Sequence, residues 1–138
     1  MLIGIVGKPS SGKSTFFKAL TLANVEIANY PFTTIKPNHG IGHVKIKDVA
    51  QEFGKESNPR EGFVLDNYRF VPVEILDVAG LVPEAHKGKG LGLEFLNDLN
   101  QADALIHIID ISGSTNEKGE SVPKLSYNPN NDVRFLEL

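Results

Sequence analysis

One stretch at the start of the chain decides the fold: Leu2-Ile3-Gly4-Ile5-Val6-Gly7-Lys8-Pro9-Ser10-Ser11-Gly12-Lys13-Ser14, followed by a helical run at residues 15–22. A strand, a loop with the spacing G-x-x-x-x-G-K-S and a helix thus follow one another directly. In such a loop the backbone N–H groups wrap a phosphate at a helix N-terminus, where the helix dipole is positive. Lys13 would reach the β- and γ-phosphates and the Ser14 hydroxyl would bind Mg²⁺, whereas a plain glycine-rich turn needs neither side chain. The stretch therefore predicts a P-loop.

The composition of the chain is that of an ordinary globular domain. Of its 138 residues, 41% are hydrophobic and 22% are charged. The absence of cysteine excludes disulfides and thiolate metal sites and fits a reducing compartment. Met1 leads directly into the first strand without a signal peptide, and the longest apolar run, 104–109, is too short to span a bilayer. We therefore expect a cytoplasmic protein that does not bind membranes.

Charge is distributed unevenly along the chain. The net charge is −3, yet residues 1–47 hold six lysines and a single acidic residue, Glu26. A basic first third suits a polyphosphate ligand. The lysines are scattered and not interleaved with aromatic residues, so we expect no direct nucleic-acid binding by this segment.

Apolar runs alternate with helical patterns along the chain. The run at 104–109 is bounded by polar residues, as is typical of a central parallel strand covered on both faces. Strands that alternate with helices favour an α/β fold with a doubly wound, mostly parallel sheet and with ligands at the carboxyl ends of the strands. The expected elements are strands at 2–7, 41–46, 68–76 and 104–109 and helices at 13–22 and 93–100.

Three parts of the chain lack a regular pattern. Residues 23–40 are irregular, residues 47–68 form a polar surface excursion with a short helix, and residues 111–138 form a tail in which a helix starts only near Val133. A nucleotide-binding α/β domain normally needs further strands after this point. We therefore expect residues 1–138 to be the N-terminal portion of one domain, truncated on its C-terminal side.

A second motif follows the strand at 68–76. This strand runs into Asp77-Val78-Ala79-Gly80, a D-x-x-G element. A carboxylate at the end of a strand can hold a water ligand of Mg²⁺, and Gly80 lets a backbone N–H approach a γ-phosphate. The pattern alone is common and often marks a simple turn, but its place after a P-loop and a buried strand favours the phosphate-sensing role.

A third motif, Tyr30-Pro31-Phe32-Thr33-Thr34-Ile35-Lys36-Pro37-Asn38, lies on the irregular segment between the other two. A threonine here can bind Mg²⁺ through its hydroxyl and the γ-phosphate through its N–H, so that the loop is ordered only while that phosphate is present. Spacing does not choose between Thr33 and Thr34, and either could simply cap a strand.

Together the motifs G-K-P-S-S-G-K-S-T, N-Y-P-F-T-T-I-x-P-N and D-V-A-G-L-V-P-x-A-H-x-G-x-G-L-G resemble the Obg-related P-loop GTPases, in particular their archaeal YchF-like branch. The resemblance implies a Ras-like G domain of the OBG type that binds GTP or ATP with Mg²⁺, hydrolyses it slowly and acts in the cytoplasm near ribosomes. It places Mg²⁺ on Ser14, on Thr34 and, through water, on Asp77. The nucleotide-binding residues that it implies are Gly7, Lys8, Pro9, Ser10, Ser11, Gly12, Lys13, Ser14, Thr15, Thr34, Asp77 and Gly80.

Catalysis is the least defined part of this expectation. Leu81 follows Gly80 where many switch GTPases have a water-orienting glutamine, so slow turnover is expected. Relatives with an apolar residue here often use K⁺, held partly by a P-loop asparagine, but the matching position is Ser10. His86 is the candidate catalytic side chain, and a solvated loop histidine is the simpler alternative. We expect His107 to be a core histidine.

The sequence leaves the base and the reaction open. Guanine specificity in such proteins comes from an N-K-x-D element, which does not occur in this chain, so GTP and ATP both remain possible. A binding module whose partner affinity depends on nucleotide, without useful hydrolysis, is an alternative. A small-molecule kinase is a weaker one, because the only arginines are Arg60, Arg69 and Arg134, too few for an arginine-rich lid.

Overall fold

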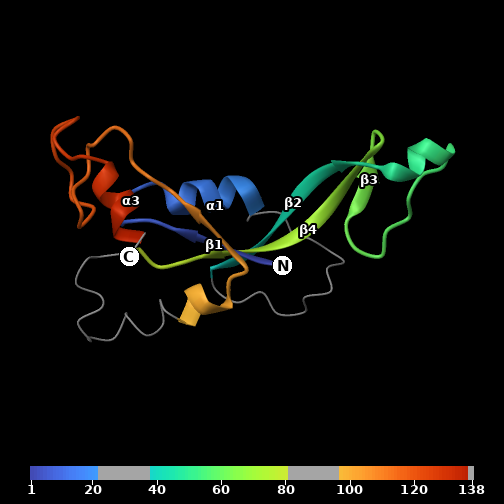
Figure 1. Cartoon of the computed structure of the whole chain (residues 1–138), viewed down its shortest axis with the longest axis horizontal. Helices are drawn as coiled ribbons and strands as arrows, with labels where there is room; N and C mark the ends of the chain where they lie inside the picture. The colour runs from blue at the N-terminus through green and yellow to red at the C-terminus, as the bar shows by residue number, and fades with distance from the viewer. Residues whose placement is uncertain (22–37, 81–96, 137–138) are drawn as a thin grey trace.

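A mixed β-sheet forms the middle of the molecule in the computed structural model, which describes residues 1–21, 38–80 and 97–136 (Figure 1). Its strands lie in the order β2-β4-β1-β5, and β3 pairs with β4 at the outer end. The strands are β1 (Leu2–Val6), β2 (His39–Lys47), β3 (Phe63–Leu65), β4 (Tyr68–Asp77) and β5 (Ala104–His107), and the helices are α1 (Lys13–Thr21), the 3-10 helix η1 (Val49–Phe53) and α3 (Asn130–Leu136).

The centre of the sheet is parallel and its outer part is antiparallel. β1 pairs in parallel with both β4 and β5, whereas β2 and β3 run antiparallel to β4. The expectation of a mostly parallel sheet therefore needs correction outside β4, β1 and β5. For β3 the cause is local: Asp66 and Asn67 both have positive φ, as a tight two-residue hairpin requires, and this turn joins β3 to β4 as antiparallel neighbours.

The segment 47–68 thus holds a strand that the sequence analysis missed. β3 has only three residues and all of them are apolar, so its sequence lacks the alternation of apolar and polar residues that marks a half-buried strand. The short helix expected in this segment is η1, which begins after Asp48. The Asp48 carboxylate accepts the N–H of Ala50, which is the usual hydrogen bond of a helix N-cap.

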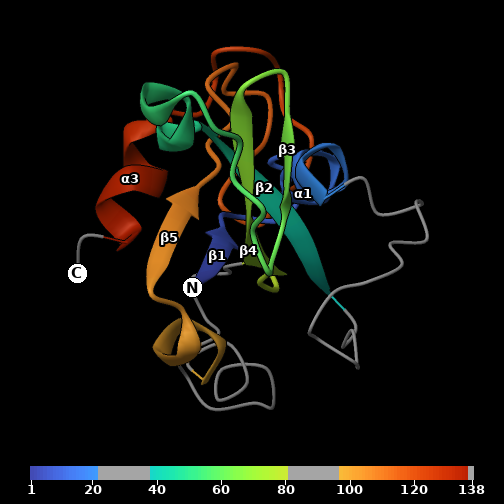
Figure 2. The ribbon, with the colours of Figure 1, turned by 90° about the vertical axis from the view of Figure 1, so that its right-hand side faces the viewer.

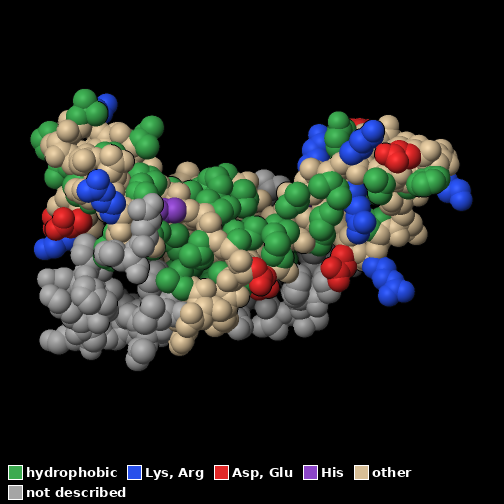
Figure 3. All heavy atoms as spheres, in the orientation of Figure 1, with side chains coloured by type: hydrophobic (Ala, Val, Ile, Leu, Met, Phe, Trp, Pro, Cys, Tyr) green, Lys and Arg blue, Asp and Glu red, His purple; other side chains and the backbone are tan. Residues whose placement is uncertain are grey.

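The outer half of β2, β3 and β4 forms an arm that projects to the right in Figure 1. Several of its apolar side chains are exposed, and Figure 3 shows hydrophobic atoms on the visible face of the arm. These exposed side chains are Val44, Ile46, Phe63, Leu65 and Tyr68.

Two small hydrophobic clusters lie on opposite faces of the central strands. Helix α1 covers one face, where Phe17 packs with Ile5, Val73 and Ile75. The other face consists of Val6, Leu76 and Val78, against which Leu99, Phe135 and Leu136 pack. Figure 2 shows α1 and α3 on the two sides of the sheet. This arrangement brings α3, near the end of the chain, to the same end of the sheet as the first loop.

β5 differs from the strand that the sequence predicted. The apolar run was expected to be a central strand covered on both faces, but among the described residues β5 pairs only with β1, and Leu105 is 47% exposed. An apolar run indicates that burial of the strand would be favourable. Burial also requires a neighbouring strand, and the described residues provide none at the edge of β5 that faces away from β1. The strand also ends at His107, earlier than the run itself.

Helix α3 begins at Asn130, before the position expected from the sequence. The Asn128 side chain accepts the N–H of Asn130, and Pro129 follows with a fixed φ that suits the first turn of a helix. Of the helix expected at 93–100, the structure describes only residues 97 onward, and these are helical.

Candidate functional site

The P-loop joins β1 to α1 at the carboxyl end of the central strand. Lys13 is the first residue of α1, and its Nζ donates a hydrogen bond to the Lys8 carbonyl oxygen at 3.0 Å. The Lys13 side chain is buried, which lowers its pKa, although the nearby Asp77 carboxylate partly opposes this. The Lys13 ammonium is thus already bound to the backbone of the P-loop. A phosphate in the loop would accept the same ammonium hydrogens.

The loop backbone has the conformation that a phosphate cradle needs. Gly12 has φ 96°, and a Cβ placed there would meet no atom within 4 Å among the described residues. Ser10 also has positive φ, at 62°. Successive residues with unusual φ point backbone N–H groups toward one side of a loop, and this forms an anion-binding concavity.

Ser14 and Asp77 meet at the carboxyl ends of the neighbouring strands β1 and β4. The Ser14 hydroxyl donates to Asp77 Oδ2 at 2.9 Å, while Asp77 Oδ1 is buried and has no hydrogen-bond partner among the described residues. A hydroxyl and a carboxylate with a spare oxygen are the hard oxygen donors that Mg²⁺ prefers. These two residues, predicted from separate motifs, therefore fit a divalent cation.

Gly80, the last residue of the D-x-x-G element, lies directly against the P-loop. A Cβ added at Gly80 would lie 2.9 Å from Pro9 Cγ. The two loops are therefore packed together through a residue without a side chain, and a larger residue at position 80 would press against Pro9.

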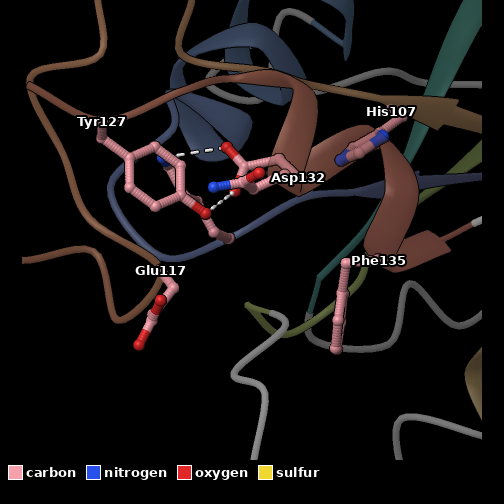
Figure 4. A pocket seen from close by; sticks show the side chains of 7 residues that line it. His107, Glu117, Tyr127, Asp132 and Phe135 are labelled. Carbon is pink, nitrogen blue, oxygen red and sulfur yellow. Dashed lines mark hydrogen bonds and ion pairs between the residues drawn. The ribbon is translucent and has the colours of Figure 1, made fainter. Parts of the chain in front are cut away.

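The Lys8 side chain, in contrast, turns away toward the end of the chain. It is only 4% exposed, and its Nζ donates to the Thr115 carbonyl oxygen at 2.8 Å and forms an ion pair with Asp132 at 2.9 Å. The same Nζ lies 4.1 Å from the centroid of the Tyr127 ring. Tyr127 in turn donates its hydroxyl hydrogen to Asp132 Oδ1 at 2.8 Å, as Figure 4 shows.

These contacts border a pocket of about 250 Å³. His107, which the sequence predicted as a core histidine, is instead half-buried in its wall, and burial lowers its pKa while Asp132 opposes the change. Burial and the hydrogen bond to Asp132 raise the pKa of Tyr127 to about 12. The pocket is lined by Lys8, His107, Glu117, Tyr127, Asn131, Asp132 and Phe135.

Sequence reasoning did not single out Thr115, Tyr127 or Asp132. They belong to no recognised motif and lie more than 100 residues from Lys8, so no local periodicity links them to it. The available signal was a lysine at an x position of the G-x-x-x-x-G-K-S spacing, where the pattern requires no particular side chain.

Several predicted residues lie outside the described residues. These include the switch threonines Thr33 and Thr34, as well as Leu81 and His86. His39, to which the sequence assigned no role, pairs through Nδ1 with Glu74 Oε1 at 2.8 Å. In the described part of the chain no helix is long and apolar enough to cross a membrane.

Comparisons with known proteins agree with this geometry. A family model described as "50S ribosome-binding GTPase" matches residues 2–135. A GTP-binding protein of Methanocaldococcus jannaschii is 52% identical over 98% of this chain and 34% of its own length. The ribosome-binding ATPase YchF of Bacillus subtilis is 45% identical over 77% of this chain and 27% of its own.

A solved structure shows the same fold. The crystal structure of a GTP-binding protein from Pyrococcus horikoshii superposes with a TM-score of 0.70 at 34% identity, over 99% of this chain and 31% of the other. The chain thus spans about a third of the length of the relatives it matches, or less. The match of the family model over nearly all residues, together with these relatives, shows that the chain belongs to the 50S ribosome-binding GTPase family of P-loop proteins and is a YchF-like member of it.

Proposed function

We propose that this chain binds the phosphates of a guanine nucleotide together with Mg²⁺ and forms the phosphate-binding half of a slow nucleotide switch. The convergence of three side chains supports this most strongly. Lys13, Ser14 and Asp77 come from two sequence motifs and meet at one end of the sheet, beside an open glycine-rich loop.

In this proposal the backbone of residues 7–15 surrounds the phosphates. The Lys13 ammonium exchanges the Lys8 carbonyl for phosphate oxygens, and Gly80 offers its backbone N–H to the γ-phosphate. Because the Lys8 ammonium is occupied by Thr115 and Asp132, Lys8 would contribute its backbone rather than its side chain.

The Ser14 hydroxyl and the free oxygen of Asp77 would hold Mg²⁺, Asp77 through a water molecule, and Thr34 would complete the set in the triphosphate state. Mg²⁺ supplies neutralisation of the charge on the β- and γ-phosphates. A hydroxyl holds a cation through an oxygen lone pair, so Ser14 would keep donating its hydrogen to Asp77 while its oxygen faced Mg²⁺.

Hydrolysis is proposed to be slow, because Leu81 offers no hydrogen bond to an attacking water. His86 stays the candidate catalytic side chain. Activation by K⁺ is doubtful, because Ser10 stands where a coordinating asparagine would be expected. Without a catalytic group, the same site would serve a binding module that responds to nucleotide.

The base remains the open part of the proposal, and ATP is the second candidate. The relatives carry both descriptions: the archaeal ones are named as GTP-binding proteins and the YchF proteins as ribosome-binding ATPases. The name of the YchF relatives supports a place of action at the ribosome, which we propose to lie in the cytoplasm.

A competition titration tests the proposal. The 138-residue chain is titrated with a fluorescent GTP analogue in Mg²⁺, and the complex is then displaced with unlabelled GTP, ATP or inorganic triphosphate. Saturable binding that EDTA weakens supports the phosphate and Mg²⁺ site. Preferential displacement by GTP or by ATP identifies the base, and equal displacement by all three shows phosphate recognition alone. Failure to bind any of them would overturn the proposal for this chain.

A further inference from the structure

We propose that Asp132 and Tyr127, at the far end of the chain, are positioning residues of the P-loop, which they hold in its phosphate-binding shape through the Lys8 side chain. This inference rests on the proposed function, since it concerns the same phosphate site. It adds that the affinity of the site depends on α3 and the segment before it.

The first argument is the burial of the Lys8 ammonium. An amino group that is 4% exposed must be balanced locally, because a buried charge without partners is very costly. Lys8 has three partners, which are the Asp132 carboxylate, the Thr115 carbonyl and the face of the Tyr127 ring. All three come from residues 115–132, so the Lys8 side chain, on the second residue of the P-loop, has its polar partners in that segment.

The second argument is that the partners are themselves fixed. Asp132 is 8% exposed, and Tyr127 donates a hydrogen bond to its other oxygen, Oδ1. Figure 4 shows the Tyr127 hydroxyl directed at the Asp132 carboxylate. Each oxygen of Asp132 therefore faces a different partner, and the carboxylate cannot rotate without losing one of them.

A third contact joins the same two segments independently of charge. Gly119 has φ 79°, and a Cβ placed there would lie 2.6 Å from the Pro9 carbonyl oxygen. The loop before α3 thus lies against the residue that follows Lys8. Two adjacent residues of the P-loop are held, one by charge and one by packing.

The consequence for binding follows from the Lys8 carbonyl. This oxygen accepts the Lys13 Nζ hydrogen bond, so the position of residue 8 sets where the phosphate-binding lysine lies. Freeing the Lys8 side chain would let the loop sample conformations that do not bind, and apparent affinity falls in proportion to the competent fraction. By linkage, a bound nucleotide must stabilise α3 to the same extent.

The test compares two substitutions that remove one negative charge from the same segment. Asp132→Asn breaks the ion pair, whereas Glu120→Gln is a matched control, because Glu120 is exposed and its side chain contacts only Asn116 among the described residues. Nucleotide affinity is measured with a fluorescent GDP analogue in Mg²⁺. Hydrogen exchange of the amides at 8–14 is measured without nucleotide and compared with that of the β1 and β4 amides.

We expect Asp132→Asn to weaken binding at least tenfold and to speed exchange at 8–14 more than in the strands, while Glu120→Gln changes affinity less than twofold. Tyr127→Phe, which keeps the ring over Lys8 and removes one hydroxyl, should act in the same direction by about threefold and serves if Asp132→Asn does not fold. The double variant Lys8→Met/Asp132→Asn should bind no more weakly than Asp132→Asn, because the two charges act as one pair.

Unchanged affinity and unchanged P-loop exchange in Asp132→Asn and Tyr127→Phe would overturn the inference and leave the proposed function intact. If the unaltered chain bound no nucleotide, the proposed function would fail, and the exchange of amides 8–14 would still decide whether Asp132 positions the loop. Uniformly faster exchange in loop and strands alike would show a purely structural role and overturn the inference too.

Discussion

Two loops leave neighbouring parallel strands at the same end of the sheet, and they satisfy their backbone in opposite ways. The loop after β5 contains Asp110, whose carboxylate accepts the N–H of Ser112 and the hydroxyls of Ser112, Ser114 and Thr115. The P-loop after β1 contains no acidic residue, and among the described residues no carboxylate accepts one of its backbone N–H groups. The loop after β5 thus supplies an anion of its own, the Asp110 carboxylate, whereas the backbone N–H groups of the P-loop can bind an anion from outside.

This difference explains why only one of the two is a candidate site. A loop whose donors are filled by an internal carboxylate has little left to offer a ligand, and the hydrogen bonds hold the pKa of Asp110 well below its usual value, with Ser112 as the main cause. Unfilled donors near a helix N-terminus favour an external phosphate. Similar topology therefore supports either a structural turn or a binding site, depending on where the negative charge resides.

The largest expected effect is on nucleotide binding by the P-loop, the loop that contains no acidic residue. Lys13→Ala should weaken nucleotide binding more than a hundredfold, because it removes the one buried ammonium among the described residues that can turn to the phosphates. Lys18→Ala is the matched control: it removes an exposed lysine from the same helix and should leave affinity unchanged. Both are measured in the competition titration described above, and equal affinities would refute the P-loop assignment.

A second substitution acts where the segment that follows β5 touches the P-loop. Gly119→Ala places a Cβ against the Pro9 carbonyl at a backbone conformation that favours glycine, so we expect a loss of stability of about 1–3 kcal/mol. Gly54→Ala is the control for the conformation alone, since Gly54 also has positive φ but its Cβ would meet nothing within 4 Å. Urea unfolding of both variants separates the contact from the strain, and equal losses would mean that the contact with Pro9 contributes nothing.

A third substitution removes the negative charge of Asp110 from the loop that follows β5. Asp110→Asn keeps the shape of the side chain but weakens the hydrogen bonds to Ser112 and Thr115, and should lower the Tm by about 5 °C. Asp103→Asn serves as a control, because Asp103 is exposed and accepts only the Leu2 N–H. A Tm as high as that of the unaltered chain would show that the internal carboxylate is dispensable.

The smallest expected effect is the pH dependence of the stability that Asp110 contributes. The folded-state pKa of Asp110 lies below its unfolded value, so its ionisation stabilises the fold above about pH 4–5, and this contribution is lost as the pH falls toward the folded pKa. The stability difference between the unaltered chain and Asp110→Asn should therefore be constant from pH 5 to 7 and shrink below pH 4. Urea unfolding at several pH values measures it, and a difference that grew in acid would contradict the assignment.

The sequence was sufficient to predict those elements whose conformation is set by the residues of one short segment. The strand, loop and helix of the P-loop were predicted closely, as was the end of the next buried strand near Asp77, because hydrophobic pattern and spacing act within about ten residues. The fold class followed from the order of these elements. The exposed edge of β5 and the short strand β3 were not predictable, since both depend on which partners are present rather than on the pattern of the strand itself.

The contact of Lys8 with the end of the chain was the least accessible from the sequence. Nothing about a lysine in a loop says whether it faces solvent, a phosphate or a carboxylate more than a hundred residues away. Only the arrangement of β1 beside β5, with α3 packed on the same end of the sheet, brings Asp132 to it.

The order of synthesis gives this contact one more consequence. The P-loop is translated before the segment that holds its Lys8 side chain, because Thr115 comes 107 residues later. At about 5–20 residues per second, these residues are made roughly 5–20 s apart, and the latter part of α3 follows after that. The P-loop is therefore made well before the carboxylate that holds Lys8, and a nascent chain that ends before Asp132 should carry this loop without its ion pair.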